Sequence, residues 1–371
     1  MSEWKEYKLG DIACFSYGRM PKKELINTGV FPIFSGYKYQ YLYPENNCDE
    51  GDLIIVARGV GGTGDVKIVR EKCYLTNLSI KVNLKNGIVL NEFFYYFFNQ
   101  ETLRYLDSGS AQSQITIQDL EKEFFMFPDI ETQKSISYIL RSLDYKIDLL
   151  HRQNATLEKM AETLFRQWFV ERRPEPVEGE AKEDWKSKPL SSIAVFLNGL
   201  ACQKFPPKNN IEKLPVLKIK ELSSGITENS DWATTDVKPE YIVKNGDVIF
   251  AWSASLMVKI WDGQDCILNQ HLFKVTSKDY PKWFYFLWCK HYLDEFIAKA
   301  ASHATTMGHI KRGDLDKAMV LIPSTKELEE MTLETEPLIE KIIANNKQIK
   351  LLVNLRDTLL PKLMSGEIRI L

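Results

Sequence analysis

The stretch that decides the fold lies near the middle of the chain, where residues 136–168 read ISYILRSLDYKIDLLHRQNATLEKMAETLFRQW. Apolar side chains recur there at alternating spacings of four and three residues. The stripe consists of Ile136, Leu140, Leu143, Ile147, Leu150, Leu157, Ala161, Leu164 and Trp168, with Asn154 in the same register. A repeat of 3.5 residues keeps one side of a helix against a partner helix, so this pattern predicts a coiled coil. Asn154 is interpreted as a residue that fixes the register of the pair.

A second stripe on the same heptad lies 195 residues further along the chain. Its members are Met331, Leu338, Ile342, Asn345, Ile349, Leu352, Leu359 and Leu363, with Thr335 and Arg356 as two weak positions. A long amphipathic helix cannot bury its apolar stripe against itself. We therefore expect the two helices to form an antiparallel pair within the chain.

The repeat extends beyond the helices. Trp4-Lys5 returns as Trp185-Lys186 at an offset of 181 residues, and Gly51-Asp52 returns as Gly246-Asp247 at an offset of 195. The second copy therefore carries about fourteen additional residues, and the pattern indicates a tandem duplication of one large unit, too long for a solenoid repeat. The predicted fold class is α+β, with two tandem α/β domains separated by an antiparallel pair of long coiled-coil helices.

These patterns predict the organisation along the chain. We expect a first domain at 1–131, a first long helix at 132–171, a charged linker with prolines at 172–184, a second domain at 185–325, and a second long helix with a tail at 326–371. Short apolar runs broken by glycine, asparagine and aspartate predict strands at 31–34, 52–57, 66–69, 78–82, 123–127 and 318–322. Aromatic helices are expected at 91–107 and 281–299, followed by polar loops at 108–114 and 301–309.

The composition is that of a globular protein of more than one domain. The 371 residues are 44% hydrophobic and 26% charged, with a formal net charge of −2, which neither favours nor excludes a nucleic-acid partner. The six cysteines form no CxxC pair and are expected to be reduced thiols. No apolar run is long enough to span a membrane, so we expect a cytoplasmic protein.

Enzymatic motifs are weak. The glycine-rich segment Gly59–Gly64 is followed by Asp65 rather than by the lysine of a phosphate-binding loop. A nuclease-like pattern of Asp129 with Asp144 is interpreted as a coincidence, because Asp144 lies on the long helix and is expected to point outward. The five histidines show no metal-ligand spacing, and no Gly-x-Ser-x-Gly elbow is present. We expect neither catalysis nor a bound metal in this chain.

Polar residues of the loops fit the reading of DNA grooves better. Amides pair bidentately with adenine and arginine pairs with guanine, whereas lysines bind phosphates. The candidate DNA-binding residues are Lys38, Arg58, Lys67, Ser110, Gln112, Gln114, Lys259, Asn269, Gln270, Thr305, Thr306 and His309. Asn269 and His271 are aligned with Asn77 and Ser79 of the first copy and could instead hold a turn. The tryptophans and the aromatic helices are expected to be core.

The duplicated unit, with its α/β part followed by a heptad helix, resembles the specificity (S) subunit of type I restriction–modification systems. The resemblance is carried by the Trp-x4-Leu-x2-Ile-Ala openings, the Gly-Asp-hydrophobic strands, and Pro128 and Pro323 ahead of the helices. The helix ends also match, at 164–170 and 359–368. One departure concerns the Pro-Pro-x-x-Glu-Gln helix entry, which reads Pro128-Asp-Ile-Glu-Thr-Gln133 in the first copy and is further degraded at 323–328 in the second.

The resemblance implies two target-recognition domains, each of which reads one half of a bipartite asymmetric site on double-stranded DNA. It implies that the helices set the spacing and dock two modification subunits, with restriction subunits added to the complex. The residues expected to bind these partners are Leu143, Ile147, Leu157, Leu164, Trp168, Ile342, Ile349, Leu352, Leu359 and Leu363. S-adenosylmethionine, ATP and Mg²⁺ are expected on the partner subunits, and no cofactor in this chain. A helix of about 37 residues is roughly 55 Å long, which suits a spacer between two readers.

Two other functions remain open from the residues alone. The chain could be a stand-alone protein that binds a bipartite DNA site, or a coiled-coil adaptor that does not bind DNA. An adaptor predicts no salt-dependent affinity for DNA, whereas both DNA-binding functions predict a strong dependence on salt.

Overall fold

The structure is a computed structural model that describes residues 4–36, 38–59, 62–85, 87–107, 113–171, 185–302 and 308–368. The chain divides into two compact units, a first unit of Met1–Ile147 with Leu352–Leu371 and a second unit of Asp148–Leu351. Both units contain a part of each long helix, α4 (Ile130–Arg166) and α10 (Thr325–Met364). The sequence boundaries given above stay a prediction, and the linker at 172–184 lies outside the described residues.

The first unit is built around a four-stranded antiparallel sheet in the order β2-β8-β5-β6. A smaller sheet in the order β4-β3-β7 contains one parallel pair, β3 with β7, and a third pairs β1 with β9. The strands are β1 Lys5–Lys8, β2 Ala13–Tyr17, β3 Phe31–Ser35, β4 Lys38–Tyr43, β5 Leu53–Val56, β6 Val66–Ile68, β7 Tyr74–Leu75, β8 Ser79–Leu84 and β9 Phe124–Phe127. The strands predicted from the apolar runs are all present, with ends that differ by one or two residues.

Aromatic residues cover the larger sheet of the first unit. Helix α2 (Asn91–Gln100) buries Phe93, Phe94 and Phe97 in one core with Leu53 and Ile80 of the sheet. The helix predicted for 91–107 is interrupted, because α2 ends at Gln100 and a 3₁₀ turn follows at Leu103–Leu106. The remaining short elements are α1 Leu9–Ile12, a 3₁₀ turn at Lys23–Leu25, and α3 Ile117–Lys122.

The second unit repeats this strand pairing. Its four-stranded antiparallel sheet has the order β11-β18-β15-β16, the mixed sheet has the order β13-β12-β17-β14, and β10 pairs with β19. The strands are β10 Lys186–Pro189, β11 Val195–Asn198, β12 Lys213–Leu217, β13 Trp232–Thr234, β14 Ile242–Val243, β15 Val248–Ala251, β16 Met257–Ile260, β17 Cys266–Leu268, β18 Leu272–Thr276 and β19 Met319–Ile322. The predicted duplication is therefore a duplication of sheet topology.

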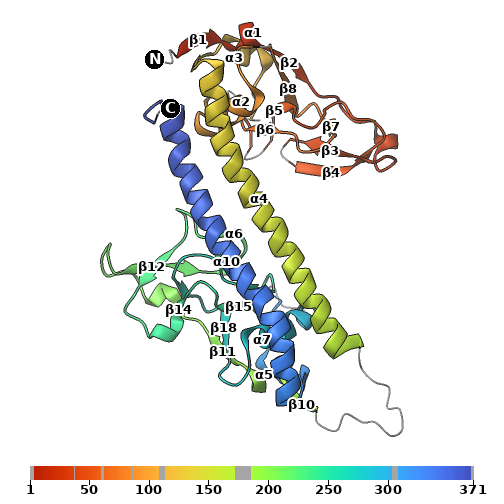
Figure 1. The fold of residues 1–371 in the computed structure, drawn as a ribbon, viewed down its shortest axis with the longest axis vertical. Coiled ribbons are helices and arrows are strands. Elements are labelled where there is room, and N and C mark those ends of the chain that lie inside the picture. The colour runs from red at the N-terminus through yellow and green to blue at the C-terminus, as the bar shows by residue number, and fades with distance from the viewer. Residues whose placement is uncertain are drawn as a thin grey trace. The chain divides into compact units, whose positions relative to one another are not determined.

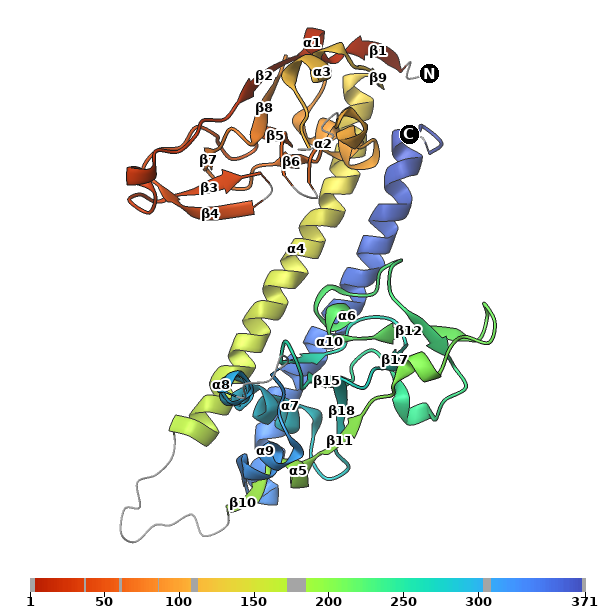
Figure 2. The same cartoon turned by 180° about the vertical axis from the view of Figure 1, so that it is seen from behind.

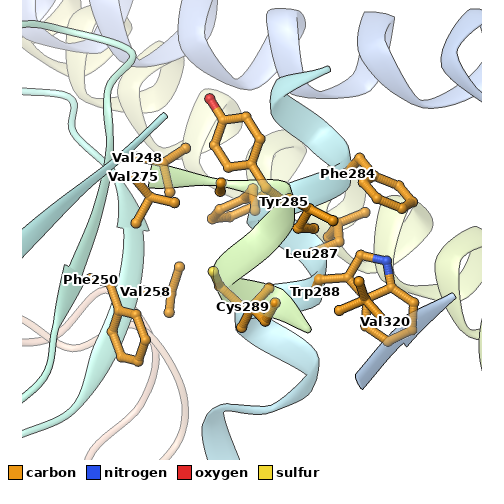
Figure 3. Packing of buried hydrophobic residues seen from close by; sticks show 14 of the residues in the cluster. Val248, Phe250, Val258, Val275, Phe284, Tyr285, Leu287, Trp288, Cys289 and Val320 are labelled. Atoms are coloured by element: carbon orange, nitrogen blue, oxygen red, sulfur yellow. The ribbon is translucent and has the colours of Figure 1, made fainter. Parts of the chain in front are cut away.

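The second unit also has helices of its own. Helix α7 (Lys282–His291) shares one core with the sheet, and Figure 3 shows Tyr285 and Cys289 on the side of Val248 and Val275, whereas Trp288 lies beside Val320. The helix predicted for 281–299 is two helices, because α8 (Leu293–Ser302) follows α7 after a break at Tyr292. Burial raises the pKa of Tyr285 to about 12. The other elements are α5 Leu190–Ile193, α6 Ile219–Ser224, α9 Arg312–Lys317, and 3₁₀ turns at Cys202–Lys204 and Pro239–Tyr241.

The long helices are continuous over 37 residues in α4 and 40 residues in α10 (Figures 1 and 2). In the first unit Ile136 at the start of α4 shares a core with Met364 at the end of α10. In the second unit Phe165 at the end of α4 shares a core with Met331 at the start of α10. The predicted antiparallel pairing is thus present within each unit. A π-helical turn at Gln167–Glu171 ends the first helix.

Candidate nucleic-acid interface

The candidate interface of the first unit begins where strand β5 ends. All four residues of β5 are fully buried, and Ala57 and Arg58 follow directly. The backbone amides of Ala57 and Arg58 donate to the carbonyl of Leu78, at 2.9 and 3.1 Å. On the other side, the amide of Ile115 donates to the carbonyl of Ala57 at 3.0 Å, and Arg58 forms an isolated β-bridge with Gln114. The sheet therefore holds Arg58 and Gln114 side by side.

The second unit builds the same arrangement at the end of β15. The amide of Trp252 donates to the carbonyl of His271 at 3.4 Å, and the amide of Ile310 donates to the carbonyl of Trp252 at 3.1 Å. Ser253 forms an isolated β-bridge with His309. Since Arg58 and Gln114 lie 195 residues before Ser253 and His309, the two bridges occupy the same place in the repeat. We call each of these places the strand-end site of its unit.

The turn beside each strand-end site corrects the alignment made from the sequence. The amide of Thr76 donates to the carbonyl of Phe34, and that of Asn269 donates to the carbonyl of Leu217, both at 3.1 Å. Asn269 therefore corresponds to Thr76, and His271 corresponds to Leu78, one position away from the predicted partners Asn77 and Ser79. The shift arises because similarity at two short polar turns cannot fix the register, whereas backbone hydrogen bonds do.

Polar and aromatic side chains converge on the strand-end site of the second unit. The hydroxyl of Ser253 lies 3.1 Å from Nδ1 of His271, and the amide of Gln270 lies 3.4 Å from Nε2 of the same ring. The indole of Trp252 packs between the rings of His271 and His309, at centroid distances of 6.0 and 6.3 Å. The predicted residues Gln270 and His309 are thus brought together, with His271 between them.

Asn269 is also at this site, but in a structural position. Its side chain is buried, and its Oδ1 accepts from the amide of His271 at 3.3 Å. The thiol of Cys202 lies beside Asn269, and burial raises the pKa of this thiol. Asn269 therefore shapes the turn that presents Gln270 and His271, as the alternative interpretation of the sequence proposed.

The strand-end site of the second unit opens into a pocket of about 260 Å³. It is lined by Gln203, Lys218, Ile219, Lys220, Asn269 and His271. Strands β12 and β17 run parallel here, and both end at this pocket. Lys218 and Lys220 were not among the predicted binding residues, because nothing in the sequence shows that the start of α6 faces the turn after β17.

The strand-end site of the first unit carries different side chains. The Nε atom of Arg58 is buried and has no hydrogen-bond partner among the described residues. The backbone amide of Gln114 donates to Oδ1 of Asp107 at 2.8 Å, which holds the start of the segment after the polar loop. Arg58 and Gln114, two of the predicted residues, are therefore neighbours at the end of one rigid strand.

Two of the predicted lysines, Lys67 and Lys259, lie on edge strands of the larger sheets. Lys67 pairs with Ile54 across β6 and β5, and Lys259 pairs with Ile249 across β16 and β15, so the two lysines are equivalent positions of the repeat. The ammonium group of Lys259 lies 3.6 Å from Asp262 and 3.5 Å from the carbonyl of Leu222. Lys38 is exposed at the start of β4. Four further predicted residues, Ser110, Gln112, Thr305 and Thr306, lie outside the described residues.

Trp252 and Asn198 were missed by the sequence reasoning. Trp252 was expected in the core, yet it is only partly buried, and its indole nitrogen donates to Oδ1 of Asn198 at 3.1 Å. The repeat could have placed Trp252 at the candidate interface. Trp252 aligns with Ala57, follows a buried strand and directly precedes Ser253, the equivalent of Arg58.

The residues predicted to bind partner subunits lie in the seam between the helices. Ile147, Ile349 and Leu363 are buried, and the other seven, Leu143, Leu157, Leu164, Trp168, Ile342, Leu352 and Leu359, are partly buried. These side chains are therefore used mainly within their own units, and their contact with partners stays a prediction. More exposed apolar side chains on the same helices are Tyr138 in the first unit and Leu333 in the second, which lie at equivalent positions.

Asp144 has a role that corrects the sequence reasoning. It does not point outward, because its carboxylate accepts a hydrogen bond from the Tyr96 hydroxyl and pairs with Arg356, both at 2.8 Å. Burial and this carboxylate raise the pKa of Tyr96. Asp144 therefore ties α2 and α10 to α4 inside the first unit, and the weak seam position Arg356 is part of that tie.

The residue that follows the glycine-rich segment has a structural partner. Asp65, which follows the glycines, is paired with Arg104 at 2.9 Å. No group of three or more potential metal ligands occurs in the described parts of the chain. No helix among the described residues is long and apolar enough to cross a membrane.

Comparison with known proteins adds the family. A family model described as the type I restriction modification DNA specificity domain matches residues 1–159 and 182–354. The chain is 29% identical to the type I restriction enzyme MjaIX specificity subunit of Methanocaldococcus jannaschii, covering 99% of this chain and 89% of the relative. It is 23% identical to the type I restriction enzyme HindI specificity subunit of Haemophilus influenzae, covering 99% and 100%.

A solved structure supports the fold. The crystal structure of a type I restriction-modification S subunit from M. genitalium aligns with a TM-score of 0.65 at 16% identity, covering 98% of this chain and 96% of that one. The resemblance identified from the helices and the repeat is confirmed. Because the family model matches both halves of the repeat, this protein belongs to the family of the type I restriction modification DNA specificity domain.

Proposed function

We propose that the chain is the DNA-recognition subunit of a type I restriction–modification complex, and that each unit reads one half of a bipartite asymmetric site. The observation that carries the proposal is the strand-end site, which occurs in both units on the same backbone frame but with different polar side chains. A protein that reads two different half-sites with two copies of one module requires this combination. Phosphate contacts by Lys38, Lys67 and Lys259 would supply affinity, and side chains of the strand-end sites would supply base contacts.

The long helices are proposed as the spacer and as the docking surface for two modification subunits. Tyr138 of α4 and Leu333 of α10 support this, because they are 76% and 78% exposed at positions 195 residues apart. A repeated apolar side chain on each helix fits a partner that binds twice. Restriction subunits would join the same complex.

The chain itself is proposed to be non-catalytic. S-adenosylmethionine for adenine methylation, and ATP with Mg²⁺ for translocation and cleavage, would be bound by the partner subunits. A cytoplasmic location is proposed because the DNA substrate is there.

The decisive experiment expresses the chain with its cognate modification subunit and maps methylated adenines across the host genome. The subunit alone is the control. A two-part motif with a fixed gap, present only with the chain, would support the proposal. An assembled complex that adds no methylation would contradict it, and affinity for DNA that does not fall with salt would favour the adaptor function instead.

A further inference from the structure

We propose that Arg58 reads a guanine in the half-site bound by the first unit, and that Ser253, at the equivalent position of the second unit, makes no such contact. This inference rests on the proposed function and deepens it, because it assigns one base class to one half of the site. Three observations support it: the fixed backbone of Arg58, the buried Nε atom of Arg58 that has no described acceptor, and the serine at the equivalent position, Ser253.

The backbone at Arg58 is fixed from both sides. It follows a strand with four fully buried residues, it is bonded through its own amide to Leu78, and it bridges to Gln114. The next residue, Gly59, has a φ of +149°, a conformation that favours glycine. Base recognition needs a side chain on a rigid element, because a mobile one loses discrimination. Arg58 meets that need through its bridge to Gln114.

The side chain of Arg58 has a hydrogen-bond donor that is not satisfied within the described residues. Three other arginines of the first unit are held by carboxylates, Arg104 by Asp65, Arg141 by Glu92 and Arg356 by Asp144. The Nε atom of Arg58 is buried, and no described residue accepts a hydrogen bond from it. A buried donor without an acceptor destabilises the free protein, and an acceptor brought by DNA would remove that penalty.

The surroundings favour a base edge over a phosphate. A guanidinium group matches the O6 and N7 acceptors of guanine in the major groove. The carboxylate of Asp107 lies at the backbone of the neighbouring Gln114, at 2.8 Å. An acid in this place opposes a phosphate, but it is compatible with the amino group of the cytosine that pairs with guanine.

The second unit differs at the same position. Ser253 is short and uncharged, and its hydroxyl already contacts Nδ1 of His271. The half-site read by the second unit therefore lacks this arginine–guanine contact. Ser253 provides a matched control, because its substitution alters the equivalent position of the other unit.

The experiment maps methylated adenines with complexes that contain the wild-type chain, Arg58→Lys, Arg58→Ala or Ser253→Ala. Wild type is expected to require a G·C pair at one position of one half-site. Both Arg58 variants should accept other pairs there, with discrimination reduced about tenfold to a hundredfold, because one bidentate base contact accounts for a preference of that size. Ser253→Ala should leave that position unchanged.

A binding measurement separates a base contact from a phosphate contact. Duplexes of the mapped motif carry 7-deazaguanine, which lacks the N7 acceptor, at the relevant position. Wild type should lose affinity for this duplex, whereas Arg58→Ala should bind both duplexes equally. If the variants keep the motif and instead reduce the salt dependence uniformly, Arg58 binds a phosphate and the inference is overturned. If the wild-type complex assembles but methylates nothing, the proposed function fails, and the inference fails with it.

Discussion

The two units share one pattern of strand pairing and differ in the side chains of their strand-end sites. In each unit the aspartate of the Gly-Asp motif pairs with a lysine on the central strand, Asp52 with Lys81 and Asp247 with Lys274. The glycine carbonyl also accepts a hydrogen bond from the start of the aromatic helix in both units, from Asn91 at 3.2 Å and from Lys282 at 2.7 Å. The Gly-Asp motif is therefore repeated for a structural reason, because it links the turn to the sheet and to the aromatic helix. It does not belong to the strand-end sites.

The long helices of the two units begin at equivalent residues but differ in one side-chain contact at their first turn. In the first unit the side chain of Gln133 is fully buried and binds the carbonyls of Ile88 and Pro128 and the amide of Leu90, at 2.8 to 2.9 Å. The second unit has Leu328 at this position, packed against its core. Both helices are capped at one equivalent position, α4 by Asp129, which accepts from the amide of Thr132 at 3.0 Å, and α10 by Ser324, which exchanges hydrogen bonds with Glu327. The degraded motif of the second copy therefore still starts a helix.

The largest expected effect comes from removing this polar network. Gln133→Leu removes the partner of one buried and two partly buried backbone groups, so we expect a loss of about 3 kcal/mol in the stability of the first unit. Hydrogen exchange of peptides from each unit, followed by mass spectrometry, measures the loss locally. Leu328→Met in the second unit is the control and should cost less than about 1.5 kcal/mol. A loss below about 1 kcal/mol for Gln133→Leu would show that the network contributes little.

Much of the fold followed from the sequence because it depends on periodicity. The heptad stripes, the duplication and the strands are patterns that any local reading can detect, and the structure contains them. The breaks in the aromatic helices at Gln100 and Tyr292 were not predicted, because aromatic composition continues beyond them. The helix α6 was also missed, since it lies in the inserted part of the second unit where no repeat guides the reading.

The candidate site was less predictable than the fold. Arg58, Gln114, Gln270 and His309 were named from their residue types, and the structure places them at the strand-end sites. The residues that hold them in place are not apparent from the sequence: Leu78 reaches the backbone of Arg58 across the sheet, and Asp107 binds Gln114 from the other end of the polar loop. Trp252 was assigned to the core because burial of a tryptophan depends on neighbours that one sequence does not reveal.

A smaller effect is expected at the paired aspartates. Asp52→Asn and Asp247→Asn each leave a partly buried lysine without its counter-ion, and we expect a loss of about 2 kcal/mol in the corresponding unit. Hydrogen exchange should show each loss in its own unit, and equal losses would confirm that the frame is shared. A loss in only one unit would show that the aspartate–lysine pair stabilises that unit and not the other.

The pH dependence of the first unit tests the same pair. Burial lowers the pKa of Lys81, but the hydrogen bond and charge of Asp52 outweigh burial, so the pKa is raised above its ordinary value. The stabilisation is therefore complete below the unfolded-state pKa of about 10.4 and is lost as the pH rises through the folded-state value. Unfolding by urea between about pH 9 and pH 12 should show this decline in wild type, mainly above about pH 10, and not in Asp52→Asn. The same decline in both proteins would mean that another group causes it.

The smallest effect should be a gain, and it compares the two halves of the helix seam. Thr335 is fully buried in the second unit, and its hydroxyl has no partner among the described residues, whereas the equivalent position of the first unit is the buried Leu140. Thr335→Val keeps the shape and removes the hydroxyl, so the second unit should gain about 1 kcal/mol. Thr335→Ser is the matched control, because it keeps the hydroxyl, loses a methyl group and should destabilise by about 1 kcal/mol. If Thr335→Val is destabilising instead, the hydroxyl has an acceptor in solution, and the second unit tolerates a polar seam position that the first unit has replaced by packing.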